Sequence, residues 1–176
     1  ASCGLKLNPW QAAVVDRVTS TCRDQFGMLL YHRMGAGKTL SLASILHNYP
    51  RSVRRVIIAP ASILTDYSAS GDFRLLYLDE TELRARLAGI TVVPMTGPPR
   101  NGQRSFENML SDDDPVELRR LFTDAIVCMD EVHNVVTMLR GNCGGNRGPG
   151  LMQALHGARR LIVMSGTPIL RDPSDI

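Results

Sequence analysis

Residues 31–40 read YHRMGAGKTL, and the run Gly35-Ala36-Gly37-Lys38-Thr39 within this stretch decides the expected fold. The run matches the second half of a phosphate-binding loop. The strict pattern has a further glycine at position 32, where this chain has His32. The flanking sequence must therefore show whether the loop is complete.

The sequence on either side of the loop has the form that phosphate binding requires. An apolar run, MLLY at 28–31, precedes the loop, and residues 39–47 have helical spacing. In a strand–turn–helix unit, glycines let backbone N–H groups face phosphates, and the helix amino terminus adds a partial positive charge. We expect residues 35–40 (Gly35, Ala36, Gly37, Lys38, Thr39 and Leu40) to bind a nucleotide. Lys38 would reach the β- and γ-phosphates, and the Thr39 hydroxyl would bind Mg²⁺.

A second acidic element follows another apolar strand. AIVCM at 125–129 is followed by Asp130-Glu131-Val132-His133. An acid at the end of a neighbouring parallel strand can hold Mg²⁺, so Asp130 is a candidate metal ligand and Glu131 a candidate base for the attacking water. The alternative is two solvated acids at a strand end. His133 lacks the spacing of a zinc site, which favours a hydrogen-bonding or coupling role.

The remaining pattern predicts an α/β fold. Further strands are expected at 56–59, 74–78, 90–95 and 161–164, and helices at 11–19, 80–87, 103–110 and 116–122. Continuous rather than alternating apolar strands indicate a mostly parallel central sheet with helices on both faces. Residues 97–102, 111–115 and 141–150 are predicted loops, the last of them a mobile surface loop.

Composition sets limits on function. The chain has 176 residues, 44% of them hydrophobic, and a formal charge of +3, which permits a nucleic-acid partner without requiring one. No apolar run approaches the ~20 residues of a membrane helix. The four cysteines form no Cys-x-x-Cys pair, so we expect neither a zinc site nor a disulfide framework, and an intracellular, reducing location.

Taken in order, the motifs resemble the first motor lobe of helicase superfamily 2, a RecA-like domain. LNPWQ at 7–11 is similar to the glutamine motif, MGAGKT at 34–39 to motif I, VIIAPASIL at 56–64 to motif Ia, DEVH at 130–133 to motif II and SGTPI at 165–169 to motif III. APASIL and the Gly-Thr-Pro sequence resemble the Swi/Snf-like branch. The combination looks like the poxvirus and giant-virus nucleoside triphosphatases of early-transcription termination.

This resemblance implies roles for further residues. Gln11 would read the adenine edge. The residues near the nucleic-acid backbone would be Pro60, Ala61 and Ser62. The residues that couple the nucleotide state to DNA binding would be His133, Ser165, Gly166 and Thr167. For Ser165 and Thr167 the alternative is capping and turn chemistry after a buried strand.

The implied function is that of a nucleic-acid-dependent ATPase, a helicase or translocase, that uses ATP and Mg²⁺ to move on DNA in viral transcription. The alternative is a nucleotide-binding structural or regulatory subunit without turnover. We expect residues 1–176 to form one RecA-like lobe, with the second lobe and its arginine fingers absent from this chain. The isolated lobe should then be weakly active or inactive.

The resemblance also implies partners and a location. The partners would be the backbone of double-stranded DNA, a second RecA-like lobe of the same protein, and RNA polymerase or other transcription machinery. No membrane partner is expected. The location would be the nucleus, a cytoplasmic viral factory or the virion. Because residues 35–39 make the backbone cradle, we expect His32→Gly to leave ATP binding nearly unchanged.

Overall fold

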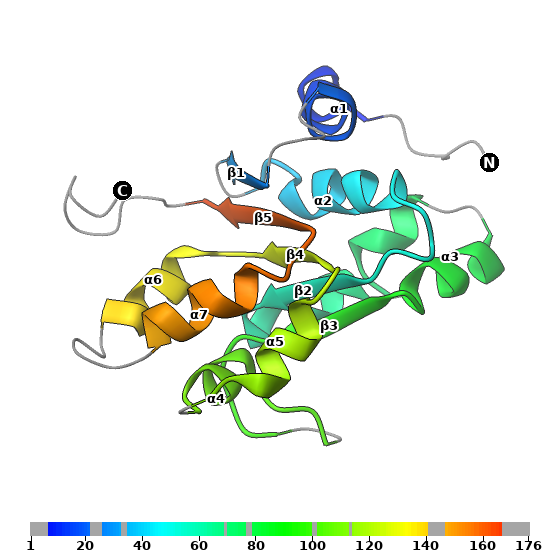
Figure 1. Ribbon diagram of the computed structural model, residues 1–176. Coiled ribbons are helices and arrows are strands. Elements are labelled where there is room, and N and C mark those ends of the chain that lie inside the picture. The colour runs from blue at the N-terminus through cyan, green and yellow to red at the C-terminus, as the bar shows by residue number, and fades with distance from the viewer. Residues whose placement is uncertain are drawn as a thin grey trace.

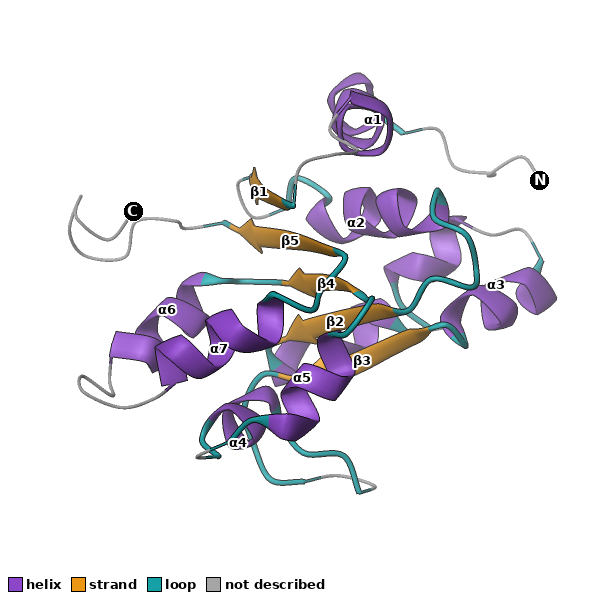
Figure 2. Ribbon diagram, in the orientation of Figure 1, coloured by secondary structure: helices purple, strands orange, loops and turns teal. Residues whose placement is uncertain are grey.

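A computed structural model describes residues 7–21, 26–32, 35–68, 70–76, 79–99, 102–112, 114–140 and 147–166. Five parallel strands form one sheet in the order β1-β5-β4-β2-β3 (Figures 1 and 2). The strands are β1 (Gly27–Tyr31), β2 (Arg55–Ala59), β3 (Ile90–Pro94), β4 (Ile126–Met129) and β5 (Arg160–Ser165). The prediction of a parallel α/β sheet is confirmed.

The central strands β2 and β4 are apolar, apart from Arg55 at the start of β2, because both of their faces are covered. Every residue of β2 and of β4 is buried. Alternate residues face opposite layers, so Ile57 and Cys128 belong to one core, whereas Val56 and Val127 belong to the other.

The helices form two layers, one on each face of the sheet (Figure 1). On one face lie α1 (Pro9–Asp16), α2 (Lys38–His47) and α3 (Glu80–Leu87), together with the 3₁₀ segments η2 (Ala61–Tyr67) and η3 (Asp72–Leu76). A π-helical segment, η1 (Arg17–Thr21), continues α1. On the other face lie α4 (Phe106–Leu110), α5 (Val116–Phe122), α6 (His133–Arg140) and α7 (Arg147–Leu155). In the described part of the chain, no helix has the length and apolar character that crossing a membrane requires.

The strand predicted at 74–78 is wrong. Residues 72–76 form the 3₁₀ segment η3, and residues 77–78 lie outside the described part. Phe73 is buried edge-on against Tyr67, whereas Leu75 is 55% exposed. The described part of this segment therefore packs against α2, with Phe73 buried, and forms no strand of the sheet.

Two helical regions also differ from expectation. The helix predicted at 103–110 begins only at Phe106, because the Ser105 side chain caps it by accepting from the Asn108 N–H. Of the loop predicted at 141–150, residues 147–150 form the first turn of α7, and 141–146 lie outside the described part. Helix α6 was not predicted.

The buried face of α5 provides a test of the core. Leu118 is fully buried on α5, and Leu75 is mostly exposed on η3. We expect Leu118→Ala to lower the free energy of unfolding by about 2–5 kcal/mol, because it removes buried methyl groups and leaves a cavity. Leu75→Ala should change it by less than about 0.5 kcal/mol. Urea denaturation of both variants measures the difference, and equal losses would contradict the described packing.

Candidate functional site

Four neighbouring parallel strands end at one edge of the sheet, and the predicted site residues follow them. The loop 35–39 comes after β1, Gly166 after β5, Asp130 and Glu131 after β4, and the segment 60–67 after β2. Parallel register aligns these ends, with Tyr31 opposite Ser165 and Met129 opposite Val163. Ligands of open α/β sheets bind at such an edge.

The loop after β1 has the backbone conformation that phosphate binding needs. Gly35 and Gly37 both have φ of 76°, a left-handed conformation that side chains disfavour. Gly37 is the amino-terminal cap of α2, which begins at Lys38. The first N–H groups of a helix lack partners within the helix and can face an anion. Residues 35–37 therefore lead directly into α2, whose first turn contains Lys38, Thr39 and Leu40, and phosphate binding by these residues stays a prediction.

Lys38 and Glu131 form an ion pair across the site. Lys38 Nζ lies 2.8 Å from Glu131 Oε1, and the two side chains are 10% and 21% exposed. The Gly166 N–H donates to Glu131 Oε2 at 3.2 Å. Partial burial pushes the pKa of Glu131 upward, but the hydrogen bonds from Lys38 and Gly166 outweigh it, so this pKa lies below its ordinary value. Glu131 is thus held as a carboxylate.

Glu131 also has an unusual backbone. Its φ is 49°, and the only other described non-glycine residue with a positive φ is Asp124. The Glu131 N–H donates to Asp130 Oδ1 at 2.8 Å, which ties the turn to the preceding side chain. Left-handed backbone at a non-glycine residue costs free energy and is concentrated at functional sites.

Asp130 is a buried acid with two hydrogen bonds. Its side chain lies at the end of β4 and the residue is 2% exposed. Besides the Glu131 N–H, it accepts a hydrogen bond of 2.6 Å from the Tyr67 hydroxyl to Oδ2. Burial raises the pKa of Asp130, and the two hydrogen bonds offset part of that rise. Sequence reasoning missed Tyr67, since no local pattern marks a single tyrosine at the end of a 3₁₀ segment.

Motifs II and III meet through a hydrogen bond. His133 Nδ1 lies 3.0 Å from the Ser165 hydroxyl and 3.3 Å from Glu131 Oε2. With the Gly166 N–H on the same carboxylate, the end of β5 contacts the acidic turn directly. Thr167, the remaining residue of the predicted coupling set, lies outside the described residues.

Gln11 lies against the phosphate loop. Its Nε2 donates to the Gly37 carbonyl at 3.3 Å, and its Oε1 accepts from the Asn8 N–H at 3.0 Å in the capping box of α1. The residue is 5% exposed. Both ends of the amide are therefore engaged within the protein, each with one further proton or lone pair, and the adenine contact stays a prediction.

His32 has a contact that the sequence did not reveal. Its ring lies 4.5 Å from that of Trp10, centroid to centroid, at an interplanar angle of 49°. Burial, followed by the nearby Lys38 charge, lowers the pKa of His32. The residue at the end of β1 thus packs on the start of α1, next to Gln11.

The predicted nucleic-acid residues lie at the start of η2. Pro60 caps this segment, and Ala61 and Ser62 are exposed. Their contact with a nucleic-acid backbone stays a prediction.

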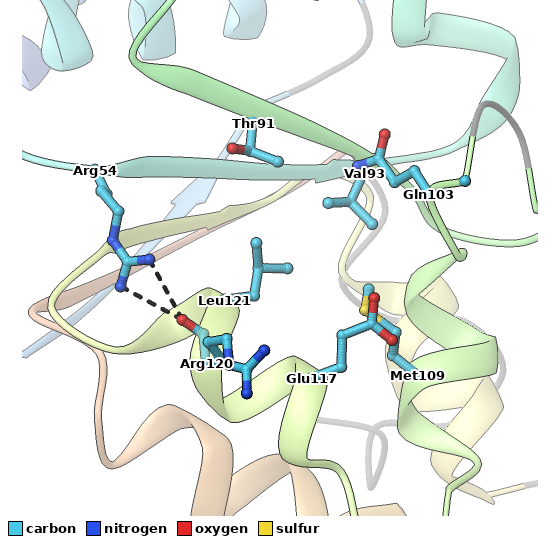
Figure 3. A pocket seen from close by; sticks show the side chains of 9 residues that line it. Arg54, Thr91, Val93, Gln103, Met109, Glu117, Arg120 and Leu121 are labelled. Carbon is cyan, nitrogen blue, oxygen red and sulfur yellow. Dashed lines mark hydrogen bonds between the residues drawn. The ribbon is translucent and has the colours of Figure 1, made fainter.

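A cavity of ≈ 510 Å³ lies elsewhere, between β3, α4 and α5 (Figure 3). Its floor includes Val93, Met109 and Leu121, and none of the predicted site residues lines it. The guanidinium of Arg54 at its margin donates to the backbone carbonyls of Arg120 and Thr123. This arginine therefore joins the start of β2 to the end of α5.

This chain is similar to known proteins in sequence and in fold. No protein-family model matches the chain. A protein of Acanthamoeba polyphaga mimivirus with the provisional name ATP-dependent RNA helicase is 26% identical over 169 residues, covering 85% of this chain and 28% of the viral protein. This viral protein is therefore similar to the chain in sequence, and the fold is that of the two solved structures described next.

Two solved structures show the same fold. The SWI2/SNF2 ATPase core of Sulfolobus solfataricus in complex with dsDNA matches 99% of this chain and 34% of its own, with a TM-score of 0.66 and 18% identity. The UvsW helicase of bacteriophage T4 matches 95% of this chain and 55% of its own, with a TM-score of 0.53 and 17% identity. This chain spans less than two thirds of each of these three proteins.

The two loop glycines provide a matched test of the Gln11 contact. Both have φ of 76°, but a Cβ at Gly37 would lie 2.5 Å from Gln11 Nε2, whereas a Cβ at Gly35 would meet open space. We expect each alanine variant to have a free energy of unfolding lower by about 1–2 kcal/mol, because alanine is strained in a left-handed backbone conformation. Gly37→Ala should lose about 1 kcal/mol more, because Gln11 must give up its hydrogen bond.

A double-mutant cycle isolates this extra cost. In a Gln11→Ala background, Gly37→Ala and Gly35→Ala should destabilise the protein equally, as measured by urea denaturation. A difference that persists without the Gln11 amide would contradict the contact.

Proposed function

We propose that this chain is the ATP-binding lobe of a nucleic-acid-dependent ATPase that couples ATP hydrolysis to movement on DNA. The observation that carries the proposal is the meeting of Lys38 and Glu131 at 2.8 Å, beside the left-handed loop of Gly35 and Gly37. These residues come from loops separated by 93 positions, so the fold, not local sequence, brings them together.

The residues fit a nucleotide with its metal ion. Thr39 and Asp130 offer oxygen ligands, and the Asp130 carboxylate accepts a hydrogen bond of 2.6 Å from the Tyr67 hydroxyl. Mg²⁺ prefers such oxygen ligands, with phosphates completing its shell, and when bound it would neutralise charge on the β- and γ-phosphates. The N–H groups of the loop and of the start of α2 would hold the polyphosphate.

Lys38 and Glu131 would then change partners. To reach a phosphate, the Lys38 ammonium must leave Glu131 Oε1, which removes the carboxylate's counter-ion. Glu131 keeps the Gly166 N–H on Oε2 and can accept a proton from the attacking water on Oε1. The water oxygen bonds to the γ-phosphorus as the bond to the β–γ bridging oxygen breaks, and ADP and phosphate leave.

The proposed polymer is double-stranded DNA, held through its phosphate backbone. The exposed start of η2 at Ala61 and Ser62 lies at the same sheet edge as the nucleotide residues. In support, one structure with this fold is a dsDNA complex. The viral relative carries the name of an RNA helicase, so RNA is the competing substrate. Backbone contacts would make binding independent of sequence and sensitive to salt.

The proposal also covers the second lobe, the protein partners and the location of this protein. Residues 1–176 would form one RecA-like lobe, and a second lobe of the same protein would close over ATP and supply the arginine fingers. The mimivirus relative supports a viral setting. Action with RNA polymerase or other transcription machinery is part of the same proposal. An intracellular location, in the nucleus, a viral factory or the virion, would accompany that role.

Substitution of Glu131 tests the hydrolytic role. In the intact protein, we expect Glu131→Gln to lower ATP hydrolysis by about 100-fold or more while ATP still binds, because the general base is lost. Glu117→Gln is the matched control, since Glu117 lies on α5 and pairs with Arg104 outside the site. Steady-state phosphate release, with duplex DNA or duplex RNA of equal length, measures both changes and the preferred polymer. A wild-type protein that binds ATP without hydrolysing it would support the structural-subunit alternative instead.

The isolated chain provides a second test. We expect residues 1–176 alone to hydrolyse ATP at least about 1,000-fold more slowly than the intact protein, because an arginine finger contributes that much. Single-turnover hydrolysis of both proteins with duplex DNA makes the comparison. DNA-stimulated turnover by the isolated chain at the intact rate would contradict the two-lobe proposal.

A further inference from the structure

Three arginines contact the turn that joins α4 to α5, and two of them bind acids in it. Arg104 Nη1 and Nη2 donate to the two carboxylate oxygens of Asp112, both at 2.7 Å. Arg119 Nη1 donates to Asp114 Oδ1 at 2.5 Å. Each of these two arginines therefore has an acidic partner in the turn.

The third arginine, Arg147, has a serine where the other two have an acid. It is the first residue of α7, and its Nη2 donates to the Ser111 hydroxyl at 2.7 Å. Among the described residues, this hydroxyl is the one hydrogen-bond partner of the Arg147 guanidinium, and no acid pairs with it. Arg147 Nε is buried and has no acceptor, which is uncommon for a buried donor. A positive charge with an unused donor therefore lies beside Ser111.

Ser111 can lose its hydroxyl proton without leaving another group unsatisfied. The residue is exposed and is the carboxyl-terminal cap of α4. Its hydroxyl donates to the Glu107 carbonyl at 2.7 Å, and the same carbonyl accepts the Ser111 N–H at 3.0 Å. The sequence continues with Asp112-Asp113-Asp114, a run of negative charge that a basic substrate-binding site would attract.

We propose that Ser111 is a phosphorylation site, modified by a serine kinase that recognises acidic residues, and that Arg147 binds the resulting phosphate. In the transfer, Ser111 Oγ bonds to the γ-phosphorus of ATP as the bond to the β–γ bridging oxygen breaks. The hydroxyl proton passes to the kinase, and ADP leaves. The phosphate on Ser111 has a charge of about −1.5 to −2 at pH 7 and three acceptor oxygens, so it can accept from both Nη2 and Nε of Arg147.

A purely structural hydrogen bond between Ser111 and Arg147 is the competing explanation. Both explanations join the end of α4 to the start of α7, but they predict opposite effects of a phosphate. If the site suits only a hydroxyl, a phosphate breaks the contact and loosens α7. If the site suits an anion, an ion pair replaces a bond to a neutral acceptor, and α7 is held more firmly. Neither residue belongs to the proposed nucleotide site, so this inference does not depend on the proposed function.

The test is phosphorylation of the intact protein, followed by hydrogen exchange. The protein is incubated with ATP and a serine kinase that recognises acidic residues, and mass spectrometry locates the phosphate, which we expect on Ser111. Amide hydrogen exchange is then compared with and without the phosphate. We expect the amides of α7 to exchange about tenfold more slowly in the phosphorylated protein, because the ion pair opposes local opening of this helix. The amides of α3, on the other face of the sheet, should exchange at an unchanged rate.

Three variants assign the slower exchange to one guanidinium. In Arg147→Gln, phosphorylation should no longer slow exchange in α7, because the cation is gone. In Arg147→Lys, the slowing should fall to about threefold, since an ammonium keeps the charge but lacks the planar fork of donors. Arg119→Gln is the matched control: it removes the partner of Asp114 in the same turn and should keep the tenfold slowing.

The outcomes are distinct. A protein that the kinase leaves unmodified at Ser111 overturns the proposal. So does faster or unchanged exchange in α7 after phosphorylation, because the contact would then suit only a hydroxyl. Equal slowing in the wild type and in Arg147→Gln also overturns it, since the phosphate would act through another group. If Arg147→Gln does not fold, Arg147→Lys decides in the same way, and an undiminished tenfold slowing in that variant contradicts the fork of donors.

Discussion

The arrangement of the site depends on one buried carboxylate, that of Asp130. A charged or polar group that is 2% exposed costs free energy unless it is hydrogen-bonded. The Glu131 N–H satisfies one oxygen and the Tyr67 hydroxyl satisfies the other. The first bond accompanies the left-handed backbone of Glu131, which places that side chain beside Lys38 and Gly166. The second hydrogen bond, from Tyr67, fixes the end of η2. The conformations of both segments therefore follow from the need to hydrogen-bond the buried Asp130 carboxylate.

The same constraint reaches the surface of the molecule through η2. This segment has exposed residues, Ala61 and Ser62, at its start and the buried Tyr67 at its end. The buried end is held by both Phe73 and Asp130. Under the proposed function, η2 would therefore join the residues that face the polymer to Asp130, the proposed metal ligand.

Most of the strands could be predicted because a local sequence pattern encodes them. Contacts between positions far apart in the sequence could not. The strand predicted at 56–59 was correct, because β2 and its neighbours are covered on both faces and such strands have continuous apolar runs. The run at 74–78 was misread, because a short apolar run is also compatible with the 3₁₀ segment η3, in which Phe73 is buried and Leu75 is exposed. Tyr67 could not be foreseen at all. Its hydrogen-bond partner, Asp130, lies 63 positions away, and spacing alone does not encode such a contact.

The departure from the strict loop pattern at position 32 has a structural explanation. Among the described residues, positive φ outside glycine occurs only at Asp124 and Glu131, so the backbone at His32 is one that any residue adopts and no glycine is needed there. A glycine would also leave Trp10 without the ring that lies 4.5 Å from it. Trp10 precedes Gln11, whose amide holds the Gly37 carbonyl that caps α2. His32 therefore packs on Trp10 at the start of α1, beside the Gln11 amide that contacts the Gly37 carbonyl.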